Sequence, residues 1–169
     1  MKLVPKISNK LIKKIKYLRL IVFDFDGVFT DNKVYISENN IEMVRCDRSD
    51  GLGIKRVQEL GVKTYIISSE KNSVVSIRSK KLGVPCLHGI NDKKKELEKI
   101  LKKLKIKFSE TLFVGNDIND LECLSACGLS MSPIDCSPEV HNIVNYISKK
   151  KGGDGFVREV CDMVNYYYK

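Results

Sequence analysis

From residue 18 onward, short apolar runs alternate with segments in which apolar residues recur at helical spacing. A nearly continuous apolar run predicts a buried parallel strand, whereas apolar residues three or four positions apart predict an amphipathic helix. The predicted strands are Leu20–Phe25, Thr64–Ser68, Pro85–His88, Thr111–Val114 and Leu129–Met131. The predicted helices are Leu52–Leu60, Ser73–Leu82, Asp92–Leu104, Asp120–Ala126, Pro138–Val144 and Gly155–Asn165. This alternation predicts an α/β fold in which helices cover both faces of a parallel sheet.

One pair of short runs departs from this alternation. Val34–Ser37 and Ile41–Cys46 are strand-like, and Glu38-Asn39-Asn40 between them is typical of a turn. We therefore predict a small β-hairpin inserted after the first strand.

Nothing in the sequence divides the chain into parts. Its 169 residues contain no internal repeat and no flexible linker, which fits one domain. Residues 1–17 form a basic, amphipathic lead-in that carries Leu11, Ile12 and Ile15. We expect this lead-in to be peripheral to the fold and the domain to span residues 18–169.

The net charge of +9 suggests an anionic partner. Much of this charge lies in Lys10–Arg19 and Lys93–Lys107. In the second run Leu97, Ile100 and Leu104 recur at helical spacing, so the lysines cover the outer face of a helix. Base stacking would require interleaved aromatic residues, which this run lacks. We expect no nucleic-acid partner, and a basic nucleic-acid binder is the weaker competing class.

The sequence favours a cytoplasmic protein. No apolar run approaches the roughly 18 residues that span a bilayer, and the N-terminus lacks the features of a secretory signal. The six cysteines are scattered, without the paired motifs of a zinc site, which favours reduced thiols. We therefore expect no membrane partner.

Polar groups follow three of the predicted strands at the point where each strand ends. Asp24-Phe25-Asp26-Gly27 ends the first, Ser68-Ser69 the second, and Gly115-Asn116-Asp117 the strand Thr111–Val114. Ligands of parallel sheets bind at the carboxyl ends of the strands. We therefore expect these groups to meet in one site.

The acidic side chains of this set suit phosphoryl chemistry. Crowded carboxylates repel one another unless a cation lies between them, and Asp24, Asp26 and Asp117 are hard oxygen ligands of the kind that Mg²⁺ prefers. One carboxylate can then attack phosphorus while the other moves a proton. Gly27 would let the backbone turn sharply beside the phosphate. The competing interpretation is a set of surface acids in turns or helix caps.

Two further residues remain ambiguous from the pattern alone. Ser68 can hydrogen-bond a phosphate oxygen, but it can equally cap the following helix. Lys93 begins a helix, where a cation opposes the macrodipole, so a nearby anion would explain it. A phosphate is one candidate for that anion and Asp24 is another.

Together these motifs resemble those of the haloacid dehalogenase superfamily. Residues 23–31 (FDFDGVFTD) resemble its nucleophile motif, and Ile67-Ser68-Ser69 its second motif. Asp92-Lys93 resembles the third motif and residues 115–120 (GNDIND) the fourth, all in the expected order. The hairpin, residues 48–53 and residues 151–160 resemble the branch without a large cap. That branch includes 3-deoxy-octulosonate 8-phosphate phosphatases and the phosphatase-like domains associated with acylneuraminate cytidylyltransferases.

The resemblance implies a Rossmann-like sheet and roles for individual residues. Asp24 would be the nucleophile and a metal ligand, and Asp26 would be the general acid/base and give its backbone carbonyl to the metal. Asp117 would be a further ligand of Mg²⁺, and Asp120 would orient the metal shell. Asn116 stands where many relatives carry Asp, which removes one negative charge. The phosphate would be held by Ser68, Ser69, Lys93 and Gly27.

The resemblance also implies a substrate class and an assembly. We expect a phosphatase for the phosphate of a 2-keto-3-deoxy sugar acid, with a nonulosonate 9-phosphate preferred over an octulosonate 8-phosphate. Branch members form tetramers in which the hairpins lie at the centre. The alternative is a non-catalytic oligomerisation module for a cytidylyltransferase, which would be the partner.

Specificity is expected from Arg48, Glu70 and Asn72. Where octulosonate phosphatases typically carry a Gly-Arg pair, this chain has Ser69-Glu70-Lys71-Asn72. Glu70 would accept hydrogen bonds from the polyol chain, although it can also simply favour the first turn of the next helix.

Overall fold

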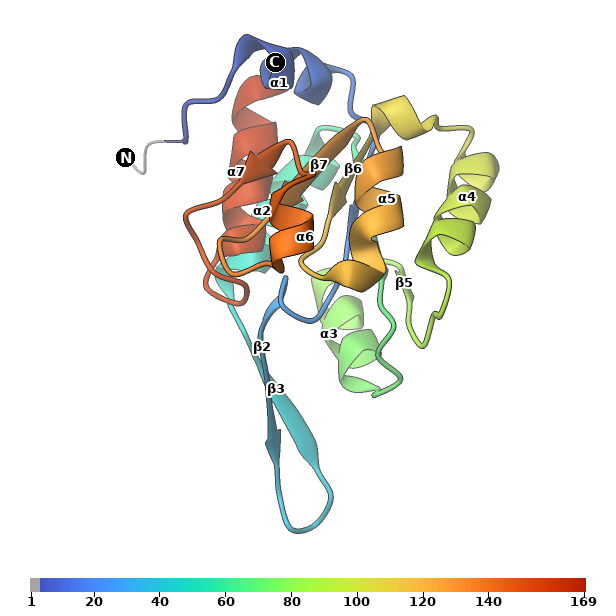
Figure 1. The fold of residues 1–169 in the computed structure, drawn as a ribbon, viewed down its shortest axis with the longest axis vertical. Helices are drawn as coiled ribbons and strands as arrows, with labels where there is room; N and C mark the ends of the chain where they lie inside the picture. Colours follow the sequence, from blue (N-terminus) through green and yellow to red (C-terminus); the bar gives the residue numbers. More distant parts are fainter. Residues whose placement is uncertain (1–3) are drawn as a thin grey trace.

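The computed structural model describes residues 4–169, so the first three residues of the lead-in lie outside the described residues. Within that range the chain forms a six-stranded parallel sheet in the order β5-β4-β1-β6-β7-β8 (Figure 1). The strands are β1 (Leu20–Phe23), β4 (Lys63–Ile67), β5 (Cys86–Leu87), β6 (Thr111–Val114), β7 (Leu129–Ser132) and β8 (Tyr146–Ile147). The predicted α/β fold class is confirmed.

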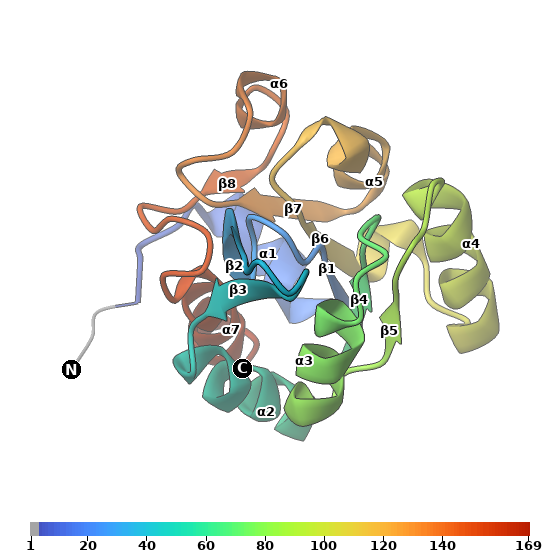
Figure 2. The same ribbon diagram turned by 90° about the horizontal axis from the view of Figure 1, so that it is seen from below.

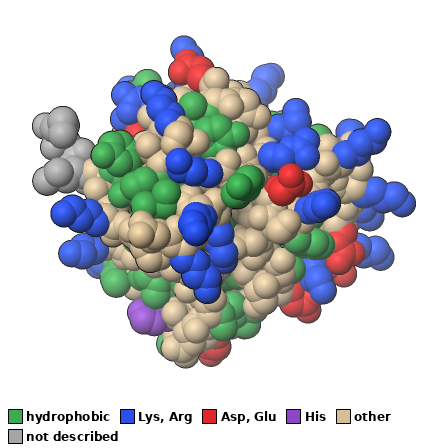
Figure 3. Space-filling model, turned by 90° about the horizontal axis from the view of Figure 1, so that it is seen from above, with side chains coloured by type: hydrophobic (Ala, Val, Ile, Leu, Met, Phe, Trp, Pro, Cys, Tyr) green, Lys and Arg blue, Asp and Glu red, His purple; other side chains and the backbone are tan. Residues whose placement is uncertain are grey.

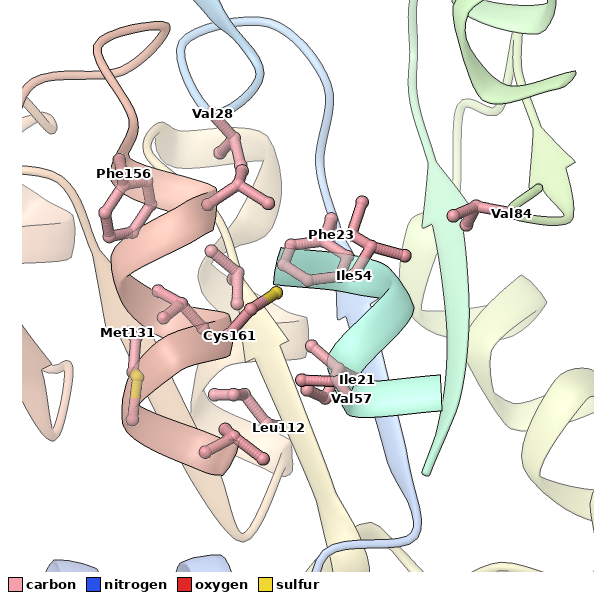
Figure 4. Packing of buried hydrophobic residues seen from close by; sticks show 14 of the residues in the cluster. Ile21, Phe23, Val28, Ile54, Val57, Val84, Leu112, Met131, Phe156 and Cys161 are labelled. Atoms are coloured by element: carbon pink, nitrogen blue, oxygen red, sulfur yellow. The ribbon is translucent and has the colours of Figure 1, made fainter. Parts of the chain in front are cut away.

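The central strand β1 contributes to two hydrophobic cores, one on each face of the sheet. Ile21 and Phe23 pack with the helices α2 (Ser49–Glu59) and α7 (Phe156–Tyr167), as Figure 4 shows. Leu20 and Val22 point to the other core, because successive side chains of a strand alternate between its faces. That second core is built with α4 (Lys93–Leu104), α5 (Leu121–Ala126) and α6 (Pro138–His141).

The predicted hairpin is formed by β2 (Thr30–Ile36) and β3 (Glu42–Cys46), which pair antiparallel and extend away from the body of the molecule (Figure 1). Figure 2 shows the hairpin from its tip, in front of the carboxyl ends of the central strands. β2 begins earlier than predicted, since Thr30 already pairs with Cys46, and the ladder is irregular between Thr30 and Val34. Asn32 adopts a left-handed backbone there, with φ of 60°.

Several element boundaries differ from the predicted ones for local reasons. β1 ends at Phe23, although the Asp24 N–H still donates to the Val114 carbonyl of β6 at 2.8 Å. β8 was not predicted, since two residues carry too little pattern to identify a strand. The remaining elements are α3 (Val74–Leu82) and two short 3₁₀ helices, η1 (Phe108–Glu110) and η2 (Ile118–Asp120).

The lead-in contains the helix α1 (Asn9–Lys16), capped by the Ser8 hydroxyl. The expectation that it is peripheral is wrong for its apolar face, because Ile15 is fully buried in the core that α7 shares. Lys10, Lys13 and Lys16 are exposed, and Figure 3 shows basic side chains over the end of the molecule opposite the hairpin. None of the helices between residues 4 and 169 is long and apolar enough to cross a membrane.

Helices α2 and α7 are joined by a buried carboxylate. Asp50, in the first turn of α2, accepts a hydrogen bond of 3.0 Å from the Arg158 backbone N–H in the first turn of α7. Its second oxygen has no hydrogen-bond partner among the described residues. Burial raises the pKa of Asp50 to about 7, although the Arg158 N–H opposes this shift.

Asp50→Asn should therefore make the protein more stable at alkaline pH. Because folding raises the pKa of Asp50, its ionisation destabilises the fold as pH rises from the unfolded value near 4 towards about 7. Asparagine keeps an acceptor for the Arg158 N–H and has no charge to bury. The gain in the free energy of unfolding should be about 2–3 kcal/mol larger at pH 8 than at pH 5. Urea denaturation of both proteins measures this difference, with the exposed Asp154→Asn as the control. Equal effects at the two pH values would contradict the argument.

Candidate active site

The carboxyl ends of β1 and β6 open onto a cavity of about 350 Å³. Three of the predicted acidic residues, Asp24, Asp26 and Asp117, lie around it, so the structure brings together groups from two loops. Asn32 and Asn119 also contribute to the cavity, which the sequence pattern did not predict. Its described lining consists of Asp24, Asp26, Asn32, Asn116, Asp117, Ile118 and Asn119.

A buried lysine pairs with two buried aspartates, one of which, Asp24, lines this cavity. Lys93 Nζ lies 2.7 Å from Asp24 Oδ1 and 2.8 Å from Asp120 Oδ1, and all three residues are buried. The sequence left a phosphate or Asp24 as the anion beside Lys93. In the structure Lys93 pairs with Asp24 and also with Asp120. Lys93 thus differs from the other lysines of α4, since its ammonium is inside the protein.

The protonation of this triad reflects its burial. Burial alone would lower the pKa of Lys93, but the charges of Asp24 and Asp120 outweigh it and raise this pKa. Burial and the charge of Asp120 raise the pKa of Asp24, while Lys93 opposes them. The ammonium therefore stays charged and favours the ionised form of Asp24.

The second oxygen of Asp120 organises the loop that follows β6. Asp120 Oδ2 accepts hydrogen bonds from the backbone N–H of Asn116 at 3.0 Å and of Asp117 at 3.4 Å. One aspartate thus fixes both Lys93 and the loop that presents Asp117 to the cavity.

The loop after β1 is held by Thr30. The Gly27 N–H donates to the Thr30 hydroxyl oxygen at 3.1 Å, and this hydroxyl donates to Asp26 Oδ1 at 3.5 Å. Gly27 has φ of 72°, and a Cβ there would overlap the Asn116 side chain. Burial, followed by the charge of Glu70, raises the pKa of Asp26. Asp26 is therefore easier to protonate than an exposed aspartate, as a general acid requires.

A second loop supports this turn from behind. A Cβ at Gly152 would overlap the Gly27 carbonyl oxygen, and the Gly153 N–H donates to the Val28 carbonyl at 3.2 Å. The Gly152 N–H donates to Asp135 Oδ1 at 3.0 Å. The sequence carried a signal for this contact in its paired glycines, but no pattern indicated what they approach.

The remaining predicted residues are not part of the described lining of the cavity. The Ser68 hydroxyl accepts from the Glu70 N–H at 3.1 Å, and Ser69 Oγ accepts from Asn119 Nδ2 at 3.2 Å. Glu70 accepts from the Asn72 N–H at 2.7 Å, and Asn72 accepts from the Val74 N–H at the start of α3. Arg48 is exposed, immediately before α2.

The donor atoms of the cavity fit a small, hard cation. Within residues 4–169 no three His, Cys, Asp or Glu side chains are grouped as a metal site. The available donors are instead of mixed type: two carboxylates, Asp24 and Asp117, and a neutral oxygen of Asn116. Asn116 Oδ1 is buried and has no hydrogen-bond partner in the described part of the chain, which a cation would supply. Oxygen donors of this kind suit Mg²⁺.

Comparison with known proteins indicates the same superfamily as the sequence motifs do. Residues 54–160 match the family model of haloacid dehalogenase-like hydrolases. The chain belongs to this family. The matched segment includes Ser68, Lys93 and Asp117, while Asp24 and Asp26 precede it.

Relatives within the family include sugar acid phosphate phosphatases. The chain is 31% identical over 159 residues to the 3-deoxy-D-manno-octulosonate 8-phosphate phosphatase KdsC of Escherichia coli K12, covering 94% of this chain and 85% of the relative. It is 32% identical over 153 residues to N-acylneuraminate cytidylyltransferase A of Danio rerio, covering 89% of this chain. This chain spans 36% of the length of that cytidylyltransferase.

Solved structures of such phosphatases superimpose closely on this chain. A putative octulosonate phosphatase from Vibrio cholerae has a TM-score of 0.95 at 30% identity, covering 99% of this chain and 94% of that structure. The Moraxella catarrhalis enzyme, in complex with magnesium ion, phosphate ion and a KDO molecule, has a TM-score of 0.92 at 29% identity, with 95% and 93% covered. The haloacid dehalogenase-like chain is therefore a phosphatase, and the resemblance seen in its motifs is confirmed.

Lys93→Met should destabilise this phosphatase strongly. The change leaves the carboxylates of Asp24 and Asp120 buried without their cation. Removing one partner of a buried ion pair costs about 3–5 kcal/mol. Chemical denaturation at neutral pH measures the loss. The exposed Lys95→Met is the matched control and should change stability by less than about 0.5 kcal/mol. A loss as small as that of the control would mean that the triad is not a stabilising unit.

Proposed function

We propose that this chain is a Mg²⁺-dependent phosphatase of a 2-keto-3-deoxy sugar acid, and that a nonulosonate 9-phosphate is the preferred substrate. The observation that carries the proposal is the position of Asp24. Its carboxylate is held by a buried ammonium at the end of the central strand, beside Asp26. The catalytic domain would span residues 18–169.

The reaction has two halves, and Asp24 and Asp26 act in both. In the first, Asp24 attacks phosphorus, the bond between phosphorus and the sugar oxygen breaks, and Asp26 gives its proton to that oxygen. In the second, Asp26 takes a proton from water, whose oxygen attacks the aspartyl-phosphate. The bond between Asp24 and phosphorus then breaks, which releases phosphate and restores both residues.

The other site residues hold the reactants. Ser68, Ser69, Lys93 and the Gly27 backbone would bind the phosphate, and Asp120 would keep Lys93 and the Asp117 loop in place. Asp24, Asp117 and the Asp26 backbone carbonyl would hold Mg²⁺, and the unpaired Asn116 oxygen is a further donor. When bound, Mg²⁺ offsets the carboxylate charge and polarises the phosphoryl group.

The choice of sugar acid depends on the segment after β4. Glu70 lies close enough to Asp26 for its charge to raise the pKa of Asp26, so it lies near the reacting groups. A carboxylate there would accept hydrogen bonds from a polyol, and it would repel the carboxylate of a shorter sugar acid. The similarity to the N-acylneuraminate cytidylyltransferase supports a nonulosonate. The similarity to KdsC favours octulosonate 8-phosphate as the second candidate.

We also propose a homotetramer built around the hairpins, in the cytoplasm. Val34, Tyr35, Ile36, Ile41 and Met43 are each more than half exposed. A two-stranded hairpin with so much apolar surface is marginal by itself and needs partners. A non-catalytic module bound to a cytidylyltransferase is the competing role, which the intact Asp24, Asp26 and Lys93 disfavour.

Asp24→Asn should abolish turnover and keep the fold, because an amide cannot attack phosphorus and Lys93 stays paired with Asp120. Phosphate release from a panel of sugar acid phosphates with Mg²⁺ measures activity, and thermal unfolding measures the fold. Ca²⁺ should support the wild type poorly, since it requires more ligands and looser geometry. Turnover by pure Asp24→Asn protein would exclude Asp24 as nucleophile. Full activity in excess chelator would exclude the metal site.

Wild-type enzyme should show a higher kcat/KM for nonulosonate 9-phosphates than for octulosonate 8-phosphate. Glu70→Ala should lower the nonulosonate value by about 1–2 kcal/mol, the scale of one lost hydrogen bond. Steady-state kinetics with both substrates gives the ratio. A ratio that Glu70→Ala leaves unchanged would remove Glu70 from substrate choice, while the phosphatase function would stand.

Light scattering at micromolar concentration should show a tetramer. The double change Tyr35→Glu and Met43→Glu alters residues that face each other across the hairpin and should give smaller species, because the added charges resist burial. Tyr166→Glu, an exposed change close to the C-terminus, is the control and should remain tetrameric. A monomeric wild type would refute the assembly.

A further inference from the structure

One hydrogen bond joins the two loops that flank Asp24. Ser69 follows β4, and Asn119 lies in η2 after β6. β4 and β6 are the two neighbours of β1 in the sheet. Asn119 Nδ2 donates to Ser69 Oγ at 3.2 Å, so this bond connects the loops on either side of the strand that ends at the nucleophile.

Other hydrogen bonds hold the loops that carry Asn119 and Ser69. Asn119 directly precedes Asp120. The Asp120 side chain accepts a hydrogen bond from the Asp117 N–H and pairs with Lys93. On the other side, the Glu70 N–H donates to Ser68, and the Gly89 N–H donates to the Glu70 carbonyl at 2.7 Å. The amide and the hydroxyl are therefore held towards each other before any ligand binds.

Because Asn119 donates this hydrogen bond, the Ser69 hydroxyl can still donate one of its own. A serine hydroxyl has one hydrogen to donate and two lone pairs to accept with. Because Asn119 is the donor, it occupies a lone pair of Ser69 and leaves the hydroxyl hydrogen for another acceptor. Anionic oxygens are the strongest acceptors of such a hydrogen.

We propose that Asn119 is a positioning residue, which aims the Ser69 hydroxyl hydrogen at a phosphoryl oxygen of the substrate. This inference rests on the phosphatase function proposed above and gives a role to Asn119, a residue of the fourth motif to which the sequence analysis assigned none. Asn119 acts through Ser69, so its effect should depend on the presence of that hydroxyl.

A double-mutant cycle tests this dependence with inorganic phosphate as the probe. Calorimetry on Mg²⁺-loaded protein gives the phosphate Kd of wild type, Ser69→Ala, Asn119→Ala and the double variant. Each single change should weaken binding about five- to tenfold, the scale of one hydrogen bond. The double variant should bind no more weakly than Ser69→Ala does, because the two residues act as one unit.

Asn119→Asp separates orientation from simple packing. A carboxylate accepts the Ser69 hydrogen instead of donating to Ser69, and it also repels phosphate, so binding should be weaker than in Asn119→Ala. Asn142→Ala, an exposed asparagine at the end of α6, is the matched control and should bind as wild type does. Melting temperatures should be unchanged throughout.

Losses that add in the double variant would overturn the role of Asn119, and so would an Asn119→Asp protein that binds as tightly as wild type. Both results would leave the phosphatase proposal intact. A wild-type protein that binds no phosphate in the presence of Mg²⁺ would overturn both proposals together.

Discussion

The site depends on a single buried ammonium that two buried carboxylates share. Taking an ion out of water costs several kcal/mol, so Lys93, Asp24 and Asp120 are tolerated inside the protein only because they lie together. They come from the end of β1, the first residue of α4 and the turn after β6. Correct packing of three separate elements is therefore required before the charges balance. The ammonium of Lys93 also opposes the rise in the pKa of Asp24 that burial causes.

Around that triad, the backbone is held by contacts that allow little movement. Asp120 fixes the loop after β6, Thr30 fixes the turn after β1, and the glycines at 152 and 153 pack directly against that turn. Short side chains on such loops can hold reacting atoms in position without a cap domain. The hairpin is the opposite case, since its apolar side chains are exposed and make few contacts that would fix its position.

The sequence predicted the fold class and most of the site because both follow from local patterns. Buried strands are apolar runs, and the residues after them, Asp24, Ser68 and Asp117, meet at one edge by topology alone. What it missed depends on three-dimensional packing. Gly152 against Gly27, the bond between Asn119 and Ser69, and the burial of Ile15 join residues far apart in the chain. No periodicity encodes such pairs, and a helix with a basic outer face can still bury one side.

The sheet ends on each side in a strand of only two residues, β5 and β8. An edge strand exposes unpaired N–H and C=O groups, and a long one is a template for aggregation. Edges as short as these offer a second chain almost nothing to pair with. The hairpin, in contrast, is a separate two-stranded sheet whose two outer edges are unpaired within the described chain and whose apolar side chains are exposed. A misfolded or crowded population would therefore associate there first, through the same strands that the proposed tetramer would use.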